Sequence, residues 1–206
     1  IIEIGPGPCG LTEAILKANP LKLISIEADA RFTPLLENLE NTHTNFSFII
    51  ADAMKVNLRD VSTGNFTIIA NLPYNVGTRL LVNWLSDIIA IDQMILMLQK
   101  EVVMRICAQP KSSDYGRLSI LCQSVANVNR VFDVKPGAFF PAPKVCSSVL
   151  SLTPKSEQIA PKLLDKIKHI TALAFNQRRK MLKSSLSSLS SSLSKDLESL
   201  NIKATD

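Results

Sequence analysis

Apolar runs alternate with amphipathic stretches along most of this chain. Short uninterrupted apolar runs are typical of strands buried on both faces, whereas apolar residues spaced by three or four are typical of helices that bury one side. This alternation predicts an α/β fold around a largely parallel sheet. We predict strands at residues 1–4, 21–26, 46–51, 66–70 and 94–98, and then at 128–134 and 146–152.

Helices are predicted in the intervals between these strands. One of them places four apolar side chains on a single face: Phe32, Leu35, Leu36 and Leu39. Another, from about Gly77 to Trp84, follows the fourth strand and buries Leu80, Leu81 and Trp84. Helices of this kind can carry the chain back over the sheet between parallel strands.

The composition changes after Pro154, which predicts a boundary between a main domain, 1–154, and a smaller one, 155–206. A helical stripe in the smaller domain comprises Leu163, Ile167, Ile170 and Ala174. Leucines spaced by three or four also run through the serine-rich stretch 184–194. An amphipathic helix or helix pair is therefore expected there rather than a disordered tail.

The basic charge is concentrated in the smaller domain. Basic and acidic residues balance at 13 each in residues 1–154, whereas residues 155–206 carry 10 basic and 5 acidic residues. A neutral body with a basic attachment is typical of proteins that bind a polyanion such as RNA. The alternative is a solvated helix face that happens to be basic.

Composition excludes several other classes of protein. Asp92 and Gln93 split the longest apolar candidate, Ile88 to Leu98, so no run reaches the length of a membrane span. The four cysteines form no C-x-x-C pair, and neither a disulfide framework nor a zinc site is indicated. We expect a soluble cytoplasmic protein with reduced thiols and no membrane attachment.

A glycine-rich turn follows the first strand. Gly5, Gly7 and Gly10 satisfy G-x-G-x-x-G, in which glycines let the backbone approach a ligand and the following helix favours an anion. Glu27 ends the second strand, 22 residues after Gly5. A carboxylate there can accept hydrogen bonds from both ribose hydroxyls of a nucleoside cofactor, either NAD or S-adenosylmethionine. The alternative is a surface acid at a strand end.

Polar residues also follow the next two strands. Asp52, with Ala53 and Met54 beside it, can accept from an adenine amino group while its neighbours pack against the ring. A helix cap or a turn is the alternative for this acid. Asn71 ends the fourth strand. Because ligands bind at the carboxyl ends of parallel strands, this repetition favours a nucleoside cofactor over separate turn acids.

The tetrapeptide Asn71-Leu72-Pro73-Tyr74 is the strongest candidate for chemistry. Proline stiffens the loop, the Asn71 amide oxygen and the Pro73 carbonyl can accept from one N–H₂ group, and Tyr74 offers a face for stacking. These features suit the exocyclic amine of a nucleobase. A plain strand-ending turn is the alternative reading of the same residues.

The proline-rich connection 136–144 is expected to present Phe139 or Phe140 opposite Tyr74, which would clamp a base between two rings. A hydrophobic plug beneath a loop is the alternative for at least one of them. Lys100 and Arg117 are candidate phosphate contacts. Each can equally form a surface ion pair.

Six motifs spread over nearly the whole chain support a family resemblance: 3–7 (EIGPG), 71–74 (NLPY), 98–101 (LQKE), 115–119 (YGRLS), 140–145 (FPAPKV) and 175–180 (FNQRRK). Together they resemble the ribosomal RNA small-subunit adenine dimethyltransferases, the kasugamycin-resistance methyltransferase family. The resemblance implies a Rossmann-like seven-stranded methyltransferase sheet with a small helical C-terminal domain. It also implies dimethylation, by S-adenosylmethionine, of two adjacent adenosines in the 3′-terminal hairpin loop of small-subunit rRNA.

The resemblance also implies roles for individual residues. Cofactor contacts are expected at Gly5, Gly7, Glu27, Ala28, Asp52, Ala53 and Asn71. Target-base contacts are expected at Asn71, Pro73, Tyr74 and Phe139, and RNA contacts at Lys100, Arg117, Arg178, Arg179 and Lys180. No metal is needed, and the implied partner of this presumed monomer is rRNA within a pre-assembled small subunit.

The chain also departs from the family pattern. Family members begin with a segment carrying a Gln-Asn-Phe motif, and Ile1 lies downstream of it, while the family's C-terminal helices continue past Asp206. We therefore expect a chain truncated at both ends.

Three other functions are compatible with parts of the sequence. The first is methylation of a large-subunit rRNA adenosine by an enzyme of the macrolide-resistance type, although the 99–101 and 115–117 stretches favour the small-subunit family. The second is a mainly non-catalytic role in small-subunit assembly. The third, a nicotinamide-dependent oxidoreductase, leaves the 71–74 loop unexplained.

Overall fold

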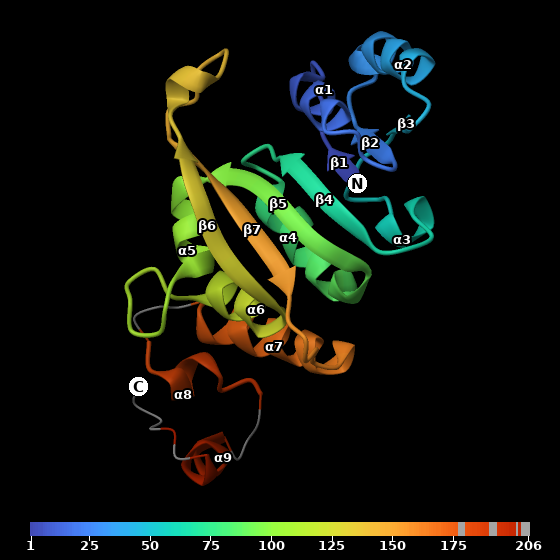
Figure 1. Cartoon of the computed structure of the whole chain (residues 1–206). Coiled ribbons are helices and arrows are strands. Elements are labelled where there is room, and N and C mark those ends of the chain that lie inside the picture. Colours follow the sequence, from blue (N-terminus) through green and yellow to red (C-terminus); the bar gives the residue numbers. More distant parts are fainter. Residues whose placement is uncertain (177–179, 190–192, 201, 203–206) are drawn as a thin grey trace.

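The computed structural model describes residues 1–206 except 177–179, 190–192, 201 and 203–206. The described chain forms one seven-stranded sheet in the order β3-β2-β1-β4-β5-β7-β6 (Figure 1). The strands β1 to β5 pair in parallel, and β7 is antiparallel to both β5 and β6. Their bounds are β1 (Ile2–Ile4), β2 (Leu23–Glu27), β3 (Phe46–Ile50), β4 (Phe66–Asn71), β5 (Ile91–Gln99), β6 (Ala126–Val134) and β7 (Ser147–Pro154).

Helices cover both faces of the sheet. The longer helices are α1 (Gly10–Lys17), α2 (Thr33–Thr42), α4 (Gly77–Trp84), α5 (Lys100–Cys107), α6 (Arg117–Val125) and α7 (Pro161–Ala174). The short ones are η1 (Ala30–Phe32), α3 (Leu58–Val61), η2 (Leu85–Ala90), η3 (Pro136–Ala138), α8 (Leu182–Ser185) and α9 (Leu193–Ser199). In Figure 1, α4 lies behind β5, α5 lies beside β6 and α6 lies near the lower ends of β6 and β7, while α8 and α9 lie below α7.

Two hydrophobic cores lie on the opposite faces of the sheet. Ile68 belongs to the larger core, which α4, α5 and α6 cover, whereas its neighbour Ile69 packs against the smaller core of α1 and α2. Successive residues of a strand point to opposite faces, so β4 contributes to both cores. This two-sided burial explains why the parallel strands read as uninterrupted apolar runs.

The parallel register brings the carboxyl ends of the central strands level. Ile4 of β1 pairs with Ile26 of β2 and with Ala70 of β4. The next residue of each strand or turn is Gly5, Glu27 and Asn71, respectively. The sheet therefore places three of the predicted site residues side by side at one edge.

The predicted strands agree with the structure apart from their ends. β5 begins at Ile91 rather than at residue 94, because Asp92 and Gln93 lie in the strand although they are polar. Asp92 accepts from Asn65, and Gln93 donates to Ser151 of β7. Such cross-strand bonds satisfy polar side chains in a strand and are invisible to a hydrophobicity pattern.

Two helical stripes differ from expectation. Leu35 of α2 is 48% exposed, and only Leu36 and Leu39 of that helix are buried. In α7, Leu163 and Ile170 are exposed, whereas Leu164 and Thr171 are buried. The Thr171 hydroxyl donates to the Ile167 carbonyl at 2.6 Å, which lets a polar residue occupy the buried face.

The C-terminal part begins on the same core as the sheet. Leu164 of α7 belongs to the larger core, and Ile167 packs against it. The expected helix pair corresponds to the short helices α8 and α9, with Leu186 and Leu197 buried. A separate domain at 155–206 remains a proposal. No helix in the described residues has the length and apolar composition needed to cross a membrane.

A buried carboxyl group connects β1, β2 and α1. Glu3 is 0% exposed, and its Oε2 accepts hydrogen bonds from the hydroxyls of Thr12 and Ser25 at 2.8 and 2.7 Å. Its Oε1 has no partner among the described atoms. Burial raises the pKa of Glu3, because the charged form is poorly solvated there, although the two hydroxyls partly oppose the shift.

The raised pKa of Glu3 predicts a pH dependence of stability. The protonated native state is favoured below the unfolded pKa, and that stability is lost as pH rises through the higher folded pKa. We expect Glu3→Gln to flatten the decline in free energy of unfolding as the pH rises above about 4.5, the ordinary pKa of a glutamate, measured by urea denaturation. The exposed Glu13, changed to Gln, is the control. An unaltered slope in Glu3→Gln would contradict the prediction.

Candidate active site

The glycine turn after β1 exposes its backbone to open space. Gly5 and Gly7 have φ values of 70° and 52°, which glycine adopts without strain. A Cβ atom at either position would meet nothing within 4 Å. The turn is held to the sheet by the Gly5 N–H, which donates to the Ile26 carbonyl at 2.9 Å. Backbone conformation therefore requires these glycines, and the space beside them is available to a ligand.

Glu27 is held next to this glycine turn by hydrogen bonds. Its side chain is largely buried, with Oε2 accepting from the Gly7 N–H at 3.0 Å and Oε1 from the Asp29 N–H at 2.8 Å. A carboxylate oxygen can accept two hydrogen bonds, so each retains one free position. The carboxylate can therefore accept two further hydrogen bonds, and the ribose contact stays a prediction. Ala28, which lies between Glu27 and Asp29 in the sequence, is exposed.

Asp52 stands at the end of the neighbouring strand. The Ala51 N–H donates to the Glu27 carbonyl at 2.8 Å, which ties the end of β3 to that of β2. Asp52 is exposed, and its Oδ1 accepts from the Met54 N–H at 2.9 Å. Ala53 and Met54 pack partly against the larger core. Oδ1 therefore stabilises the turn, which was the alternative role for Asp52. Oδ2 has no hydrogen-bond partner among the described residues.

The 71–74 loop is rigid but differs in one respect from expectation. The Pro73 carbonyl accepts from the Val76 N–H at 3.2 Å and from the Gly77 N–H at 2.9 Å. Both of its lone pairs are occupied, so Pro73 is a poor acceptor for a substrate. Among the described residues, no backbone N–H donates to the Leu72 carbonyl. The acceptor that can work with Asn71 is therefore Leu72, which sequence reasoning missed because the turn partners of Pro73 were unknown.

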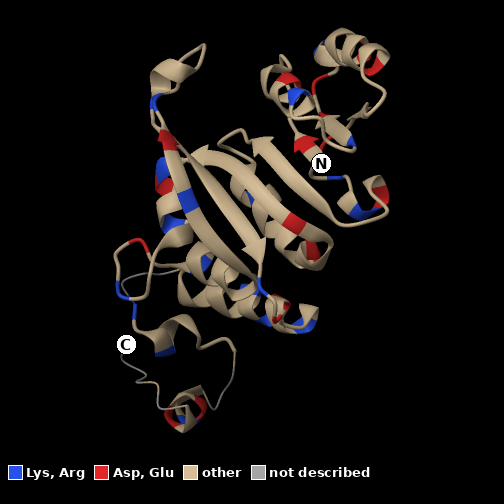
Figure 2. Cartoon of the chain, viewed as in Figure 1, with Lys and Arg blue, Asp and Glu red and all other residues tan. Residues whose placement is uncertain are grey.

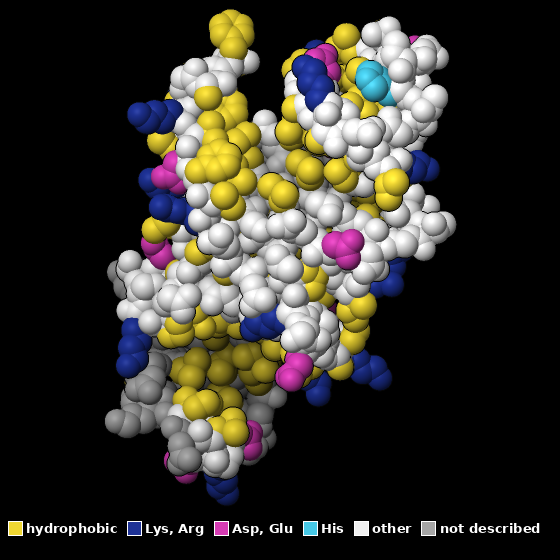
Figure 3. Space-filling model, viewed as in Figure 1, with side chains coloured by type: hydrophobic (Ala, Val, Ile, Leu, Met, Phe, Trp, Pro, Cys, Tyr) yellow, Lys and Arg dark blue, Asp and Glu magenta, His cyan; other side chains and the backbone are white. Residues whose placement is uncertain are grey.

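Tyr74 and Phe139 line one hollow. It measures about 290 Å³ and is lined by Asn71, Leu72, Pro73, Tyr74, Phe139, Pro141 and Pro143. The Tyr74 hydroxyl lies 2.9 Å from Ser147 Oγ, which fixes the ring. Figure 3 shows an indentation between the β6–β7 connection and the N-terminal helices, with apolar side chains on both walls.

Only one of the two phenylalanines lies in this hollow. Phe139 is half-buried, whereas Phe140 is 103% exposed. The sequence could not decide between Phe139 and Phe140. Adjacent loop residues point in different directions, and which of them faces the hollow depends on how the loop packs. The structure thus brings Asn71, Tyr74 and Phe139 together around one hollow, and the base clamp stays a prediction.

The predicted phosphate contacts are dispersed. Lys100 forms an ion pair with Asp133, Nζ to Oδ2 2.7 Å, and this contact with Lys100 lowers the pKa of Asp133. The ion-pair alternative therefore applies to Lys100. Arg117 is exposed at the first position of α6, and Lys180 is exposed after α7. Arg178 and Arg179 lie outside the described residues. In Figure 2, ribbon segments coloured for Lys and Arg lie on β6 and around α7.

Comparison with known proteins identifies the family. The family model described as ribosomal RNA adenine dimethylase matches residues 1–204. The chain belongs to the ribosomal RNA adenine dimethylase family. A relative from Rhodospirillum rubrum, named Ribosomal RNA small subunit methyltransferase A, is 43% identical over 190 residues, which are 92% of this chain and 66% of that protein. The protein of the same name from Ehrlichia ruminantium is 42% identical over 203 residues, 98% of this chain and 78% of its own.

Solved structures agree with membership of the dimethylase family. A dimethyladenosine transferase from Plasmodium falciparum matches with a TM-score of 0.77 and 27% identity over 96% of this chain and 70% of its own. The 23S rRNA methyltransferase ErmE has the same fold, with a TM-score of 0.68 and 23% identity over 100% of this chain and 82% of its own. The predicted Rossmann-like methyltransferase sheet and the family are thereby confirmed.

Gly77 gives the first test of the loop geometry. A Cβ there would lie 2.7 Å from Leu98 Cδ2 and 3.1 Å from Leu72 Cβ, and both leucines are buried. Gly77→Ala should therefore lower the free energy of unfolding by about 1–3 kcal/mol, measured by urea denaturation. Gly64→Ala, where a Cβ meets nothing within 4 Å, is the matched control. Equal effects at the two glycines would disprove the close packing.

The contact between Tyr74 and Ser147 gives a second test. Tyr74→Phe and Ser147→Ala each remove the same hydrogen bond, so each should lower the free energy of unfolding by about 1 kcal/mol. The double variant should lose little more than either single variant, because the bond can be removed only once. Fully additive losses in thermal or urea unfolding would show that the two hydroxyls act independently.

Proposed function

We propose that this chain transfers methyl groups from S-adenosylmethionine to the exocyclic amines of two adjacent adenosines in the 3′-terminal hairpin loop of small-subunit rRNA. One observation carries the proposal. The carboxyl ends of four neighbouring strands bring the glycine turn, Glu27, Asp52 and Asn71 to the edge that also holds the hollow of Tyr74 and Phe139. The names of the relatives support the same substrate.

The residues at the first three strand ends fit the methyl donor. The open backbone of Gly5 and Gly7 can accept the amino-acid portion, and the free positions on Glu27 suit two ribose hydroxyls. Ala28 lines the path between them. Asp52 and Ala53 suit the polar edge and the face of the adenine, respectively. S-adenosylmethionine, when bound, supplies an electrophilic methyl group.

The 71–74 loop provides the chemistry at the target base. An adenine amine is a weak nucleophile because its lone pair is delocalised into the ring. Asn71 Oδ1 and the Leu72 carbonyl accept its two N–H bonds, which turns the lone pair away from the ring and stabilises the charge that develops. Pro73 acts by stiffening the loop. Because attack is in line, positioning supplies much of the acceleration, and no metal is required.

Tyr74 and Phe139 hold the extruded base. Stacking on an aromatic face contributes about 1–3 kcal/mol per base and does not depend on sequence. The bond from Tyr74 to Ser147 keeps one ring in place before the base arrives, so less ordering is needed on binding. The pair therefore selects an unstacked base, and the Asn71 and Leu72 acceptors select one with an amino group.

Basic side chains account for binding of the RNA backbone. We assign Arg117, Arg178, Arg179 and Lys180 to phosphate contacts, with Lys100 contributing less because Asp133 neutralises it. The partner is rRNA in a pre-assembled small subunit, and the enzyme acts as a cytoplasmic monomer during ribosome biogenesis. Excess charge on residues 155–206 favours this docking at low salt.

Loss of Asn71 tests the proposed chemistry. The chain is given S-adenosylmethionine and small ribosomal subunits that lack the modification, and digested rRNA is assayed for dimethyladenosine. Asn71→Ala should lower the rate by about 100- to 1,000-fold while changing cofactor affinity only a few-fold. The control is Asn65→Ala, which removes an exposed asparagine just before the opposite end of β4.

The outcomes separate the alternatives. Near-normal turnover in Asn71→Ala would end the acceptor role. If the unaltered chain binds cofactor and subunits but forms no dimethyladenosine, a non-catalytic role in assembly is favoured. Product on large-subunit rRNA alone would instead favour the macrolide-resistance type of target.

A further inference from the structure

A groove between α4 and α6 lies outside the catalytic hollow. It measures about 370 Å³ and is lined by Met54, Thr78, Arg79, Val82, Asn83, Arg117, Leu118 and Leu121. Arg79 and Asn83 lie four residues apart on α4, so they project from the same side of that helix. The opposite side of α4 buries Leu80, Leu81 and Trp84 in the core. The groove is therefore a fixed surface between two packed helices.

The charges around this groove have one sign. Among the described residues, the ionisable side chains that line it are Arg79 and Arg117, and no Asp or Glu does so. Neither guanidinium forms an ion pair or a side-chain hydrogen bond with the part of the chain that the structure describes. Both arginines are exposed. Two free guanidinium groups on either side of one depression favour an anion with several oxygens.

Four other basic residues of the main domain are arranged differently. Arg31, Arg59, Lys100 and Arg130 all form ion pairs with aspartates. The larger hollow beside α5, about 490 Å³, contains Glu101 and Asp114 as well as Lys100 and Arg105, so its charges are mixed. The α4–α6 groove is thus the better candidate for binding an anion.

We propose that the α4–α6 groove binds a backbone phosphate of the substrate RNA between Arg79 and Arg117. The inference rests on the proposed function for the choice of RNA. Val82 and Leu118 also line the groove and offer apolar surface to the sugar of the same nucleotide. Thr78 and Asn83 add polar groups at the rim. Arg79 is a binding residue that the sequence motifs did not single out.

The position of the groove supports RNA as the occupant. α4 begins at Gly77, three residues after Tyr74, so Arg79 lies within about two helical turns of the target-base loop. On the other side, Arg117 and Leu118 also line a second hollow that reaches Phe175 at the end of α7. The groove therefore lies between the start of α4, which follows the catalytic loop, and a hollow that reaches the end of α7.

Salt-dependent RNA binding tests the proposal without any chemistry. A fluorescent RNA hairpin that carries two adjacent adenosines in its loop is titrated with the full chain, without cofactor, at several salt concentrations. Arg79→Ala should weaken binding about five-fold and lower the slope of log affinity against log salt by about 0.7–0.9, the value for one phosphate contact. Arg79→Lys should keep the slope and lose part of the affinity, because an ammonium lacks the planar fork.

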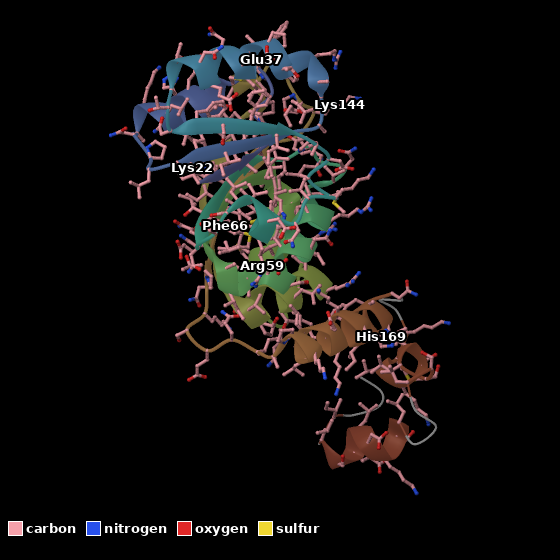
Figure 4. All side chains as sticks on the ribbon, turned by 90° about the vertical axis from the view of Figure 1, so that its right-hand side faces the viewer. Lys22, Glu37, Arg59, Phe66, Lys144 and His169 are labelled. Carbon is pink, nitrogen blue, oxygen red and sulfur yellow. The ribbon has the colours of Figure 1, made fainter. Side chains whose placement is uncertain are left out.

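A matched control removes the same charge elsewhere. Lys22 is exposed in the N-terminal part, and Figure 4 shows it on the side opposite Lys144 of the β6–β7 connection. Lys22→Ala should leave affinity and slope almost unchanged. If Arg79→Ala behaves like Lys22→Ala, the groove does not bind RNA and the proposal is overturned. Unchanged thermal unfolding of each variant confirms that the fold is intact.

A double-variant cycle tests whether the two arginines share one phosphate. If they do, Arg79→Ala combined with Arg117→Ala should cost less than the product of the two single effects. Independent, fully multiplicative losses would overturn the shared site. These measurements do not depend on methylation. An inactive chain that still shows the Arg79 effect would therefore refute the proposed function and leave the RNA groove standing.

Discussion

The parallel pairing of β1 with β2 and β4 is the constraint on which the rest of the molecule depends. β1 has only three residues, yet Ile4 pairs on one side with Ile26 and on the other with Ala70. A shift of one residue would turn every side chain of a strand to the wrong face, so burial on both faces fixes this register. The glycine turn, Glu27 and Asn71 then meet at one edge without any further interaction having to bring them together.

Rigidity is built into the site by ordinary packing. Leu72 and Gly77 are buried against Leu98, Pro73 uses its carbonyl to start α4, and Tyr74 is held by Ser147. These contacts form during folding and need no ligand. A ligand that enters the hollow would therefore cost the loop little conformational entropy. A flexible loop with the same four residues would have to order itself at each binding event.

The sequence predicts the features that follow from local chemistry. Seven strands, the glycine turn and the polar strand ends were all foreseeable, because buried parallel strands are apolar and ligands bind at their carboxyl ends. Features that depend on tertiary partners were not. The occupied Pro73 carbonyl, the pairing of Lys100 with Asp133 and the choice between Phe139 and Phe140 each require knowledge of how a distant segment docks. The buried face of α7 was misplaced for the same reason.

Pairing, more than composition, decides which charges can bind RNA. The first 154 residues are neutral by count, and the excess charge lies after them. Within the neutral part, however, several basic side chains are bound to aspartates, while Arg79 and Arg117 are left free on adjacent helices. A local positive potential therefore arises where no acidic side chain lies beside a basic one, even though the net charge of residues 1–154 is zero. This difference in pairing is the physical basis of the phosphate site that we propose between Arg79 and Arg117.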